Sequence, residues 1–159
     1  MTTQSFRRIL ELLEQHQVDY VIVGGVAAVL QGAPVTTFDI DALFKVDDAN
    51  IERLEKVLSA LNARYREHRN LRPTKSDLAA GGHMLLMTDA GPFDVLGFIG
   101  DGRRYEDVAD SVQQLPIDGL NVRVLSIEAL IAEKKKLGRE KDLIAVRVLE
   151  AVLRRRDQE

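Results

Sequence analysis

The chain has 159 residues, 45% hydrophobic and 30% charged, which is the balance of an ordinary globular protein. Its net charge of −3 argues against a surface coated in nucleic acid, and the lack of cysteine excludes disulfides and thiolate metal sites. No apolar run approaches the roughly 18 residues of a membrane span, and MTTQSFRRIL lacks the apolar core of a signal peptide. We therefore expect one cytoplasmic domain over residues 1–159, with no membrane or DNA partner.

The first part of the chain predicts a helix, a strand and a short helix. Apolar residues recur at helical spacing over residues 3–16. The run DYVIVGG then predicts a buried strand that ends at Gly24 and Gly25, and VAAVLQG predicts a short helix after it.

A second strand and a longer helix come next. DIDALFKV predicts the strand. An apolar stripe from Ile51 to Leu61 predicts the helix, which Asp47 or Asp48 caps. Residues 62–80 are polar and basic, and we expect an irregular connection there. Within it, residues 62–75 would be an ordinary exposed loop or, as the alternative, a contact for an RNA acceptor.

The second half of the chain predicts two hairpins and two C-terminal helices. GHMLLMT and PFDVLGFI form a strand pair around TDAGP, and a short helix follows near YEDVADSV. LPI and LNVRVL flank Asp118-Gly119, a dipeptide that favours a hairpin turn. Ser126 caps a helix to about Leu137, Gly138 ends it, and a last helix follows. These elements predict an α+β fold: a mixed β-sheet with helices on one side, a core over about 18–125, and a C-terminal helical pair over about 126–156 that closes a cleft.

Two carboxylates stand two positions apart in TTFDIDALF. On a strand, Asp39 and Asp41 face the same way, about 6 to 7 Å apart at the backbone. Like charges so placed repel, and at least one would take up a proton unless a cation lies between them. A third acid in an apolar strand, Asp94 of GPFDVLG, completes a set of oxygen ligands suited to Mg²⁺, one ion or a pair.

A glycine pair precedes the aspartates. Gly24 and Gly25 stand where a strand opens into a helix, which presents backbone N–H groups to a phosphate. The segment matches neither G-x-G-x-x-G nor the Walker A pattern, which argues against a dinucleotide site and an ordinary NTPase.

This order of motifs resembles the nucleotidyltransferase superfamily that shares its fold with DNA polymerase β. The resemblance is greatest to the minimal nucleotidyltransferases and to the abortive-infection-type toxin nucleotidyltransferases. It rests on Gly24, Gly25, Thr37, Asp39, Asp41 and Asp94, and on Lys134, Arg139, Lys141 and Asp142 in ALIAEKKKLGREKD. Two departures are Gly25, where the wider superfamily often has serine, and Val35, where relatives often have a basic residue.

The resemblance implies a nucleotidyltransferase fold and a Mg²⁺-dependent transfer of an NMP from an NTP, such as ATP, to an acceptor hydroxyl. Asp39, Asp41 and Asp94 would be catalytic and would hold two Mg²⁺ ions, with Mn²⁺ as an alternative. The implied nucleotide-binding residues are Gly24, Gly25, Thr37, Lys134, Arg139 and Lys141, and Lys134 would also be catalytic. Asp142 would orient a neighbouring lysine.

Three functions remain open at this point. The acceptor would be tRNA or a protein, with the chain as one component of a toxin–antitoxin pair. Alternatively, the chain would be a non-catalytic or weakly active nucleotide-binding partner, the antitoxin of such a pair. As a third alternative, it would be a small-molecule (antibiotic) nucleotidyltransferase, with the same chemistry on a different acceptor.

Overall fold

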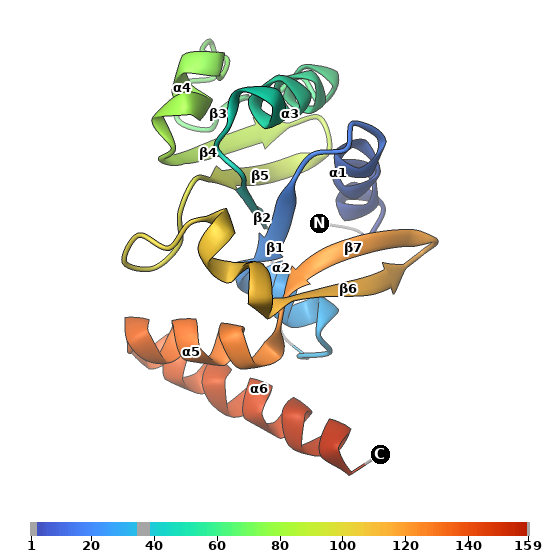
Figure 1. Cartoon of the computed structure of the whole chain (residues 1–159), viewed down its shortest axis with the longest axis vertical. Coiled ribbons are helices and arrows are strands. Elements are labelled where there is room, and N and C mark those ends of the chain that lie inside the picture. The colour runs from blue at the N-terminus through green and yellow to red at the C-terminus, as the bar shows by residue number, and fades with distance from the viewer. Residues whose placement is uncertain (1–2, 35–38, 159) are drawn as a thin grey trace.

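A seven-stranded mixed β-sheet forms the centre of the protein (Figure 1). The computed structural model describes residues 3–34 and 39–158. In chain order the strands are β1 (Tyr20–Val23), β2 (Ile40–Phe44), β3 (Arg64–Tyr65), β4 (His83–Thr88), β5 (Gly91–Leu96), β6 (Val112–Ile117) and β7 (Leu120–Leu125). Across the sheet they follow the order β3-β4-β5-β2-β1-β7-β6. β2 runs parallel to β5 and β1 parallel to β7, whereas the other neighbouring strands are antiparallel.

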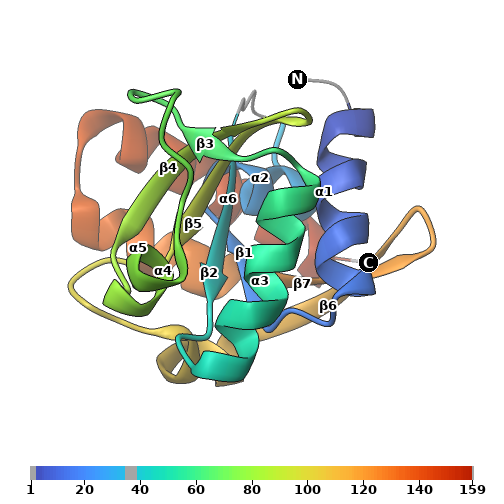
Figure 2. The same ribbon diagram turned by 90° about the horizontal axis from the view of Figure 1, so that it is seen from above.

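Helices cover both faces of this sheet. They are α1 (Thr3–Gln15), α2 (Gly24–Leu30), α3 (Asp48–Ala60), α4 (Lys75–Ala80), α5 (Ile127–Leu137) and α6 (Glu140–Asp157), with a 3-10 helix over Tyr105–Ser111. α1, α3 and α4 lie on one face, and α2, α5 and α6 lie on the other (Figures 1 and 2). The C-terminal pair, α5 and α6, packs together at the end of the molecule opposite α3 and α4.

Local sequence signals explain most of the element boundaries. Asp47 caps α3 by accepting a hydrogen bond from the backbone N–H of Asn50, and the stripe from Ile51 onwards is buried. Ser126 caps α5 in the same way, and Gly138, with φ +64°, ends that helix. The β6–β7 turn has positive φ at Asp118 and Gly119, as the predicted hairpin requires. The α+β class, the mixed sheet and the C-terminal helical pair are therefore confirmed.

Three details of the sequence prediction are wrong. Residues 62–80 are not wholly irregular, because they contain β3 and α4, and α4 is fixed by a capping box between Thr74 and Asp77 and by burial of Leu78. The short helix α2 begins at Gly24 itself rather than after the glycine pair. Helices cover both faces of the sheet rather than one, because β1 and β2 carry buried apolar side chains on both sides and need cover on each.

The buried core runs along the central strands and holds them rigidly. Tyr20, Ile22, Leu43, Phe93 and Val124 are almost fully buried. Polar side chains at the ends of β1, β2 and β5 are therefore fixed by a well-packed layer beneath them. Within the described residues, no helix is both long enough and apolar enough to cross a bilayer.

Candidate active site

Three aspartates lie together where the central strands meet. Asp41 of β2 stands directly opposite Asp94 of the parallel strand β5. Asp39 precedes Asp41 by two positions, and one guanidinium, that of Arg66, reaches both Asp39 and Asp94. The structure thus brings together the three carboxylates that the sequence singles out, although they come from separate segments of the chain.

Gly24 brings the backbone directly against Asp41. Val23, the last residue of β1, pairs with Asp41 across the antiparallel strands, so the turn into α2 lies beside the carboxylate. Gly24 has φ +69°, and a Cβ atom there would lie 2.4 Å from Asp41 Oδ2. Only glycine suits both the left-handed backbone and the close contact. Gly25 follows in the first turn of α2, so the predicted phosphate-binding pair borders the aspartates.

Arg66 is the site residue that the sequence reasoning missed. It follows β3, and its side chain donates a 2.6 Å hydrogen bond from Nη2 to Asp94 Oδ1. Its Nη1 lies 3.8 Å from Asp39 Oδ2. The alternation of arginines at positions 64 and 66 could have indicated that two of them share one face of a strand.

The site is electrostatically crowded. Burial, together with the nearby carboxylates of Asp94 and Asp39, raises the pKa of Asp41 to about 7, although Arg66 opposes the shift. Burial also raises the pKa of Asp94, against the lowering effect of Arg66. The Oδ1 atom of Asp41 is buried and accepts no hydrogen bond in the described part of the chain. Burial and the neighbouring carboxylates therefore favour the protonated form of Asp41 when no further cation is bound.

The three carboxylates are ligands of the type that a hard divalent cation prefers. Carboxylate oxygens are the usual protein ligands of Mg²⁺, and the unpaired oxygen of Asp41 has the lone pairs that a cation needs. Within residues 3–34 and 39–158, however, no three acidic or histidine side chains already stand in metal-binding geometry. The three aspartates are therefore the right type of ligand for a divalent metal. In this structure the Arg66 guanidinium lies between Asp39 and Asp94 and supplies the positive charge instead.

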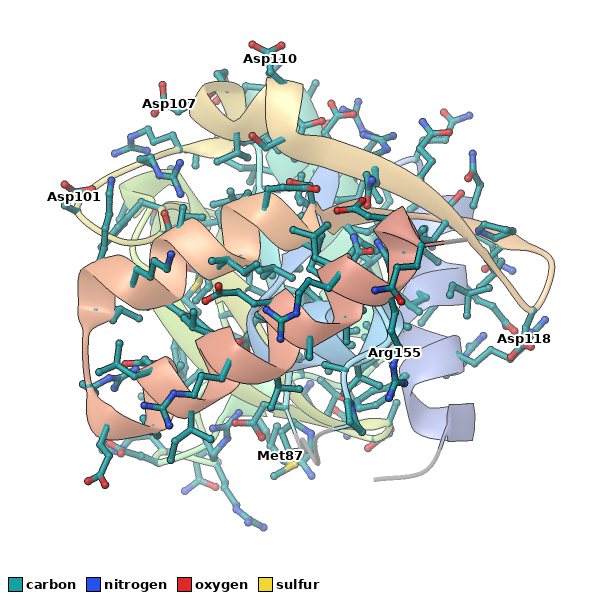
Figure 3. The ribbon with its side chains drawn as sticks, turned by 90° about the horizontal axis from the view of Figure 1, so that it is seen from below. Met87, Asp101, Asp107, Asp110, Asp118 and Arg155 are labelled. Carbon is teal, nitrogen blue, oxygen red and sulfur yellow. The ribbon has the colours of Figure 1, made fainter. Side chains whose placement is uncertain are left out.

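The basic residues predicted to bind nucleotide lie on the C-terminal helices. Lys134 is half-buried on α5, and the preceding residue, Glu133, forms an ion pair with Arg103 that ties α5 to the connection after β5. In the part of the chain that the structure describes, no salt bridge joins Lys134 to Asp41 or Asp94. Figure 3 shows α5 and α6 crossing the molecule in front of the sheet.

Arg139 and Asp142 form the cap of α6. Arg139 donates from Nε to Asp142 Oδ2 at 2.6 Å, and its backbone N–H also reaches this carboxylate. The Arg139 guanidinium holds the pKa of Asp142 below its ordinary value. Asp142 thus bonds directly to Arg139, the positive charge of Lys134 also helps to lower the pKa of Asp142, and Lys141 is exposed beside it. Thr37 and Val35 lie outside the described residues.

Hollows in the described surface do not coincide with the aspartates. Two of about 470 and 430 Å³ lie along α3 and α4, where residues such as Glu55, Arg72 and Lys75 line them. Neither is lined by Asp39, Asp41 or Asp94. The aspartates, and not these hollows, carry the groups that can do chemistry.

A family model for aminoglycoside-2''-adenylyltransferases matches residues 5–147. The chain belongs to the aminoglycoside-2''-adenylyltransferase family. This membership confirms that the protein is an enzyme of the nucleotidyltransferase superfamily, as the sequence predicts. No curated protein sequence matches the chain.

Solved structures of nucleotidyltransferases share its fold. The lincosamide antibiotic adenylyltransferase LnuA with bound lincomycin is 19% identical, with a TM-score of 0.64 over 96% of this chain and 98% of that one. ANT(2'')-Ia in complex with adenylyl-2''-tobramycin is 20% identical, with a TM-score of 0.62 over 96% and 90%. TM1012 of Thermotoga maritima, described as a candidate nucleotidyltransferase, is 22% identical, with a TM-score of 0.60 over 91% and 89%. At these identities the likeness shows the fold, and it confirms the predicted nucleotidyltransferase fold.

Proposed function

We propose that the protein transfers the AMP of ATP to a hydroxyl group of a small-molecule acceptor, with a divalent cation, Mg²⁺ or Mn²⁺, at the three aspartates. The observation that supports this most directly is the pairing of Asp41 with Asp94 across β2 and β5, with Gly24 against Asp41. In this proposal the three carboxylates would be the metal ligands and the turn at Gly24 would bind phosphate, side by side at one end of the central strands.

Each residue of the site has a separate task in this proposal. Asp39 and Asp41 would hold the metal, together with Asp94. When bound, the metal would neutralise the triphosphate and the charge that develops on the leaving pyrophosphate. Asp94, whose pKa is raised by burial, would accept the proton of the acceptor hydroxyl as the oxygen attacks the α-phosphorus.

The nucleotide would lie between the sheet and the C-terminal helices. Gly24 and Gly25 would bind its phosphates, as would Thr37 from the segment before β2. Lys134 of α5 would balance phosphate charge, with Arg139 or Lys141 behind it. The nucleotide would need to reach across from α5 to the aspartates, because Lys134 does not contact them directly.

A small-molecule acceptor is favoured by the family, which is named for an aminoglycoside, and by the fold shared with LnuA and ANT(2'')-Ia. A tRNA or protein acceptor, and a role in a toxin–antitoxin pair, remain predictions from the sequence. The experiment therefore includes all three acceptor classes.

The test is transfer of label from each α-³²P-NTP in the presence of Mg²⁺ or Mn²⁺. The acceptors are an aminoglycoside, a lincosamide, total tRNA and total protein. We expect label from ATP on a small molecule and release of pyrophosphate. Label on tRNA or protein alone would show that the acceptor is a macromolecule and not a small molecule. No transfer to any acceptor would contradict the proposed activity.

Asp41→Asn is the variant that links the activity to the site. We expect it to lose more than about 100-fold in transfer, since even outer partners of metal ligands are worth about 10- to 100-fold. The matched control is Asp110→Asn, because Asp110 is exposed and points away from the molecule, as Figure 3 shows. Equal activity in the two variants would mean that the aspartates are not the reacting centre.

A further inference from the structure

Arg66 stands at the end of a row of residues that crosses four strands. Val23 pairs with Asp41, Asp41 with Asp94, and Asp94 with Leu85 of β4. The backbone N–H of Arg66 donates to the carbonyl oxygen of Leu85 at 3.0 Å, which fixes the arginine beside this row. Its side chain must then cross β4 to reach Asp94.

The Arg66 guanidinium is held in place by three groups. Its Nη2 donates to Asp94 Oδ1 at 2.6 Å and to the backbone oxygen of Leu86 at 3.2 Å. Its Nη1 faces Asp39 Oδ2 at 3.8 Å. Its Nε is buried and has no partner in the described part of the chain. The side chain is 29% exposed and that of Asp94 is 11% exposed, so the contact is shielded from water on most sides.

The hydrogen bond to the backbone oxygen of Leu86 shows that the sheet itself fixes the orientation of the Arg66 guanidinium. A surface arginine that paired with an acid by chance would not need a main-chain acceptor within the sheet. Here the oxygen of Leu86 supports the same nitrogen that binds Asp94, which fixes the planar fork over the carboxylates.

A guanidinium and a metal ion cannot share these oxygens. Arg66 uses a lone pair of Asp94 and faces the outer oxygen of Asp39, the two carboxylates that a metal would need in addition to Asp41. An arginine stays charged at every pH of interest, so it would also repel a divalent cation a few ångströms away. One of the two cations must leave when the other binds.

We propose that Arg66 is a built-in counter-ion of the active site, which holds the carboxylates together in the metal-free enzyme and is displaced when the divalent metal binds. The inference rests on the proposed function in one respect, that the aspartates bind a divalent cation. It assigns Arg66 a positioning role: it keeps the acidic cluster assembled and lowers the affinity of that cluster for metal.

Metal binding tests this role without any measurement of turnover. The affinity of the purified protein for Mn²⁺ is measured by calorimetry, for the wild type and for Arg66→Gln, Arg66→Ala and Arg66→Lys. Arg66→Gln and Arg66→Ala remove the competing charge and should raise the affinity for Mn²⁺ by about 5-fold or more. This is the lower end of the effect that one bound ligand typically has on another in a protein. Arg66→Lys keeps the charge without the planar fork and should lie between the wild type and Arg66→Gln.

Thermal unfolding with and without Mn²⁺ separates this role from an ordinary structural one. Without metal, Arg66→Gln should unfold at a lower temperature than the wild type, because the carboxylates lose their cation. Saturating Mn²⁺ should remove that difference, since the metal supplies the missing charge. The control is Arg69→Ala, an exposed arginine on the same segment, which should change neither measurement.

Two results would overturn the proposal, and they have different meanings. If the wild type and Arg66→Gln bind Mn²⁺ equally, or if the loss of stability persists with metal, Arg66 is a structural residue and the proposed function stands. If neither protein binds Mn²⁺, and Asp41→Asn is indistinguishable from them, then the counter-ion role and the metal site fail together.

Discussion

The two ends of the β1–β2 strand pair are built in opposite ways. At one end, the Asn50 side chain is 0% exposed, accepts from the N–H of Asp19 at 2.7 Å, and donates to the carbonyl oxygens of Asp19 and Lys45. At the other end, Asp41 and Asp94 are pressed together, and Asp41 Oδ1 has no partner within the described residues. At the first end the buried Asn50 amide has partners for both its oxygen and its nitrogen, whereas the second end buries charge that only a cation can balance.

This contrast shows where stability and function reside in the same pair of strands. A buried amide with all its hydrogen bonds made contributes to stability and fixes the strand ends. Carboxylates crowded beside a left-handed glycine cost stability, and they are useful only when a ligand binds. The fold can hold the second end because the first end and the core hold the strands.

The largest effect on stability is expected at the first end. Asn50→Ala leaves the N–H of Asp19 without its partner, and it removes one of the two hydrogen bonds that the carbonyl oxygens of Asp19 and Lys45 each accept. We expect the free energy of unfolding to fall by about 3 kcal/mol, and the melting temperature by about 6 to 12 °C. Denaturant and thermal unfolding measure the change.

Nucleotidyl transfer by folded Asn50→Ala should stay near the wild-type level, because the substitution lies at the opposite end of the strands. Asn70→Ala, at an exposed position, is the matched control and should change neither property. A variant that folds normally but loses transfer would mean that the two ends are coupled, and the comparison would fail.

The second end should show an unusual dependence on pH. Asp41 has a pKa of about 7 in the folded protein and an ordinary value of 3.8. Below about pH 4 it is protonated in both states, so it makes no difference to stability. Between these values the unfolded chain releases its proton while the folded protein keeps it, so the free energy of unfolding falls as pH rises, and the loss is complete above pH 7.

Asp41→Asn removes this titration. In EDTA the variant should match the wild type near pH 4 and exceed it at pH 8. The full shift corresponds to about 4 kcal/mol at about 1.4 kcal/mol per unit of pKa. Because Asp41 shares this titration with Asp94, we expect about half of it, about 2 kcal/mol, or about 4 to 8 °C in melting temperature. The difference between the two proteins is the quantity to measure, since it cancels the other titrating groups. If Asp41→Asn is less stable than the wild type at pH 8, the folded protein does not disfavour the charged form of Asp41.

Gly24→Ala separates the two reasons why Gly24 must be glycine. The new Cβ would meet Asp41 Oδ2 at 2.4 Å, and the φ of +69° disfavours any side chain. The backbone strain should cost about 1 to 2 kcal/mol of stability. Displacement of the Asp41 carboxylate should lower transfer by more than about 10-fold, because reacting groups tolerate little misplacement.

Gly119→Ala is the matched control for this substitution. Gly119 has φ +83° in the β6–β7 turn, and no atom lies within 4 Å of its Cβ position. It should lose a similar amount of stability and no activity. If Gly24→Ala keeps full activity, the close approach to Asp41 has no functional meaning.

Local patterns in the sequence predict part of each end. The stripe from Ile51 to Leu61 and the cap at Asp47 are local patterns, so α3 could be read directly. The cluster of Asp39, Asp41 and Asp94 could be predicted from their strand-like surroundings, because each acid interrupts an apolar run.

The contact of Arg66 with Asp94 and the short helix α4 could not be predicted from such local patterns. β3 has only two residues and exists through its pairing with β4, and Arg66 reaches an aspartate 28 positions later in the chain. No periodic pattern carries such a contact. The helix α4 is too short for an apolar stripe and buries only Leu78, although its capping box at Thr74 and Asp77 was readable.

The smallest effect is expected at Asp142, a buried carboxylate with the opposite arrangement to Asp41. Its pKa is lowered because Arg139 donates to it, so the folded protein favours the charged form. This stabilisation is present at neutral pH and is lost as pH falls below the ordinary value of an aspartate. Asp142→Asn should cost about 0.5 to 1 kcal/mol at pH 7, and the cost should shrink as pH falls from 3.8 through the lowered pKa of Asp142.

Thermal unfolding of Asp142→Asn from pH 3 to pH 8 checks this sign against that of Asp41→Asn. At high pH, Asp142→Asn should lower the stability, because Asp142 has Arg139 as its own partner in the cap of α6. Asp41→Asn should raise it, because Asp41 shares the charge of Arg66 with Asp39 and Asp94. If both substitutions shifted stability in the same direction, burial alone would explain the two sites, and the arginines beside them would have no separate effect.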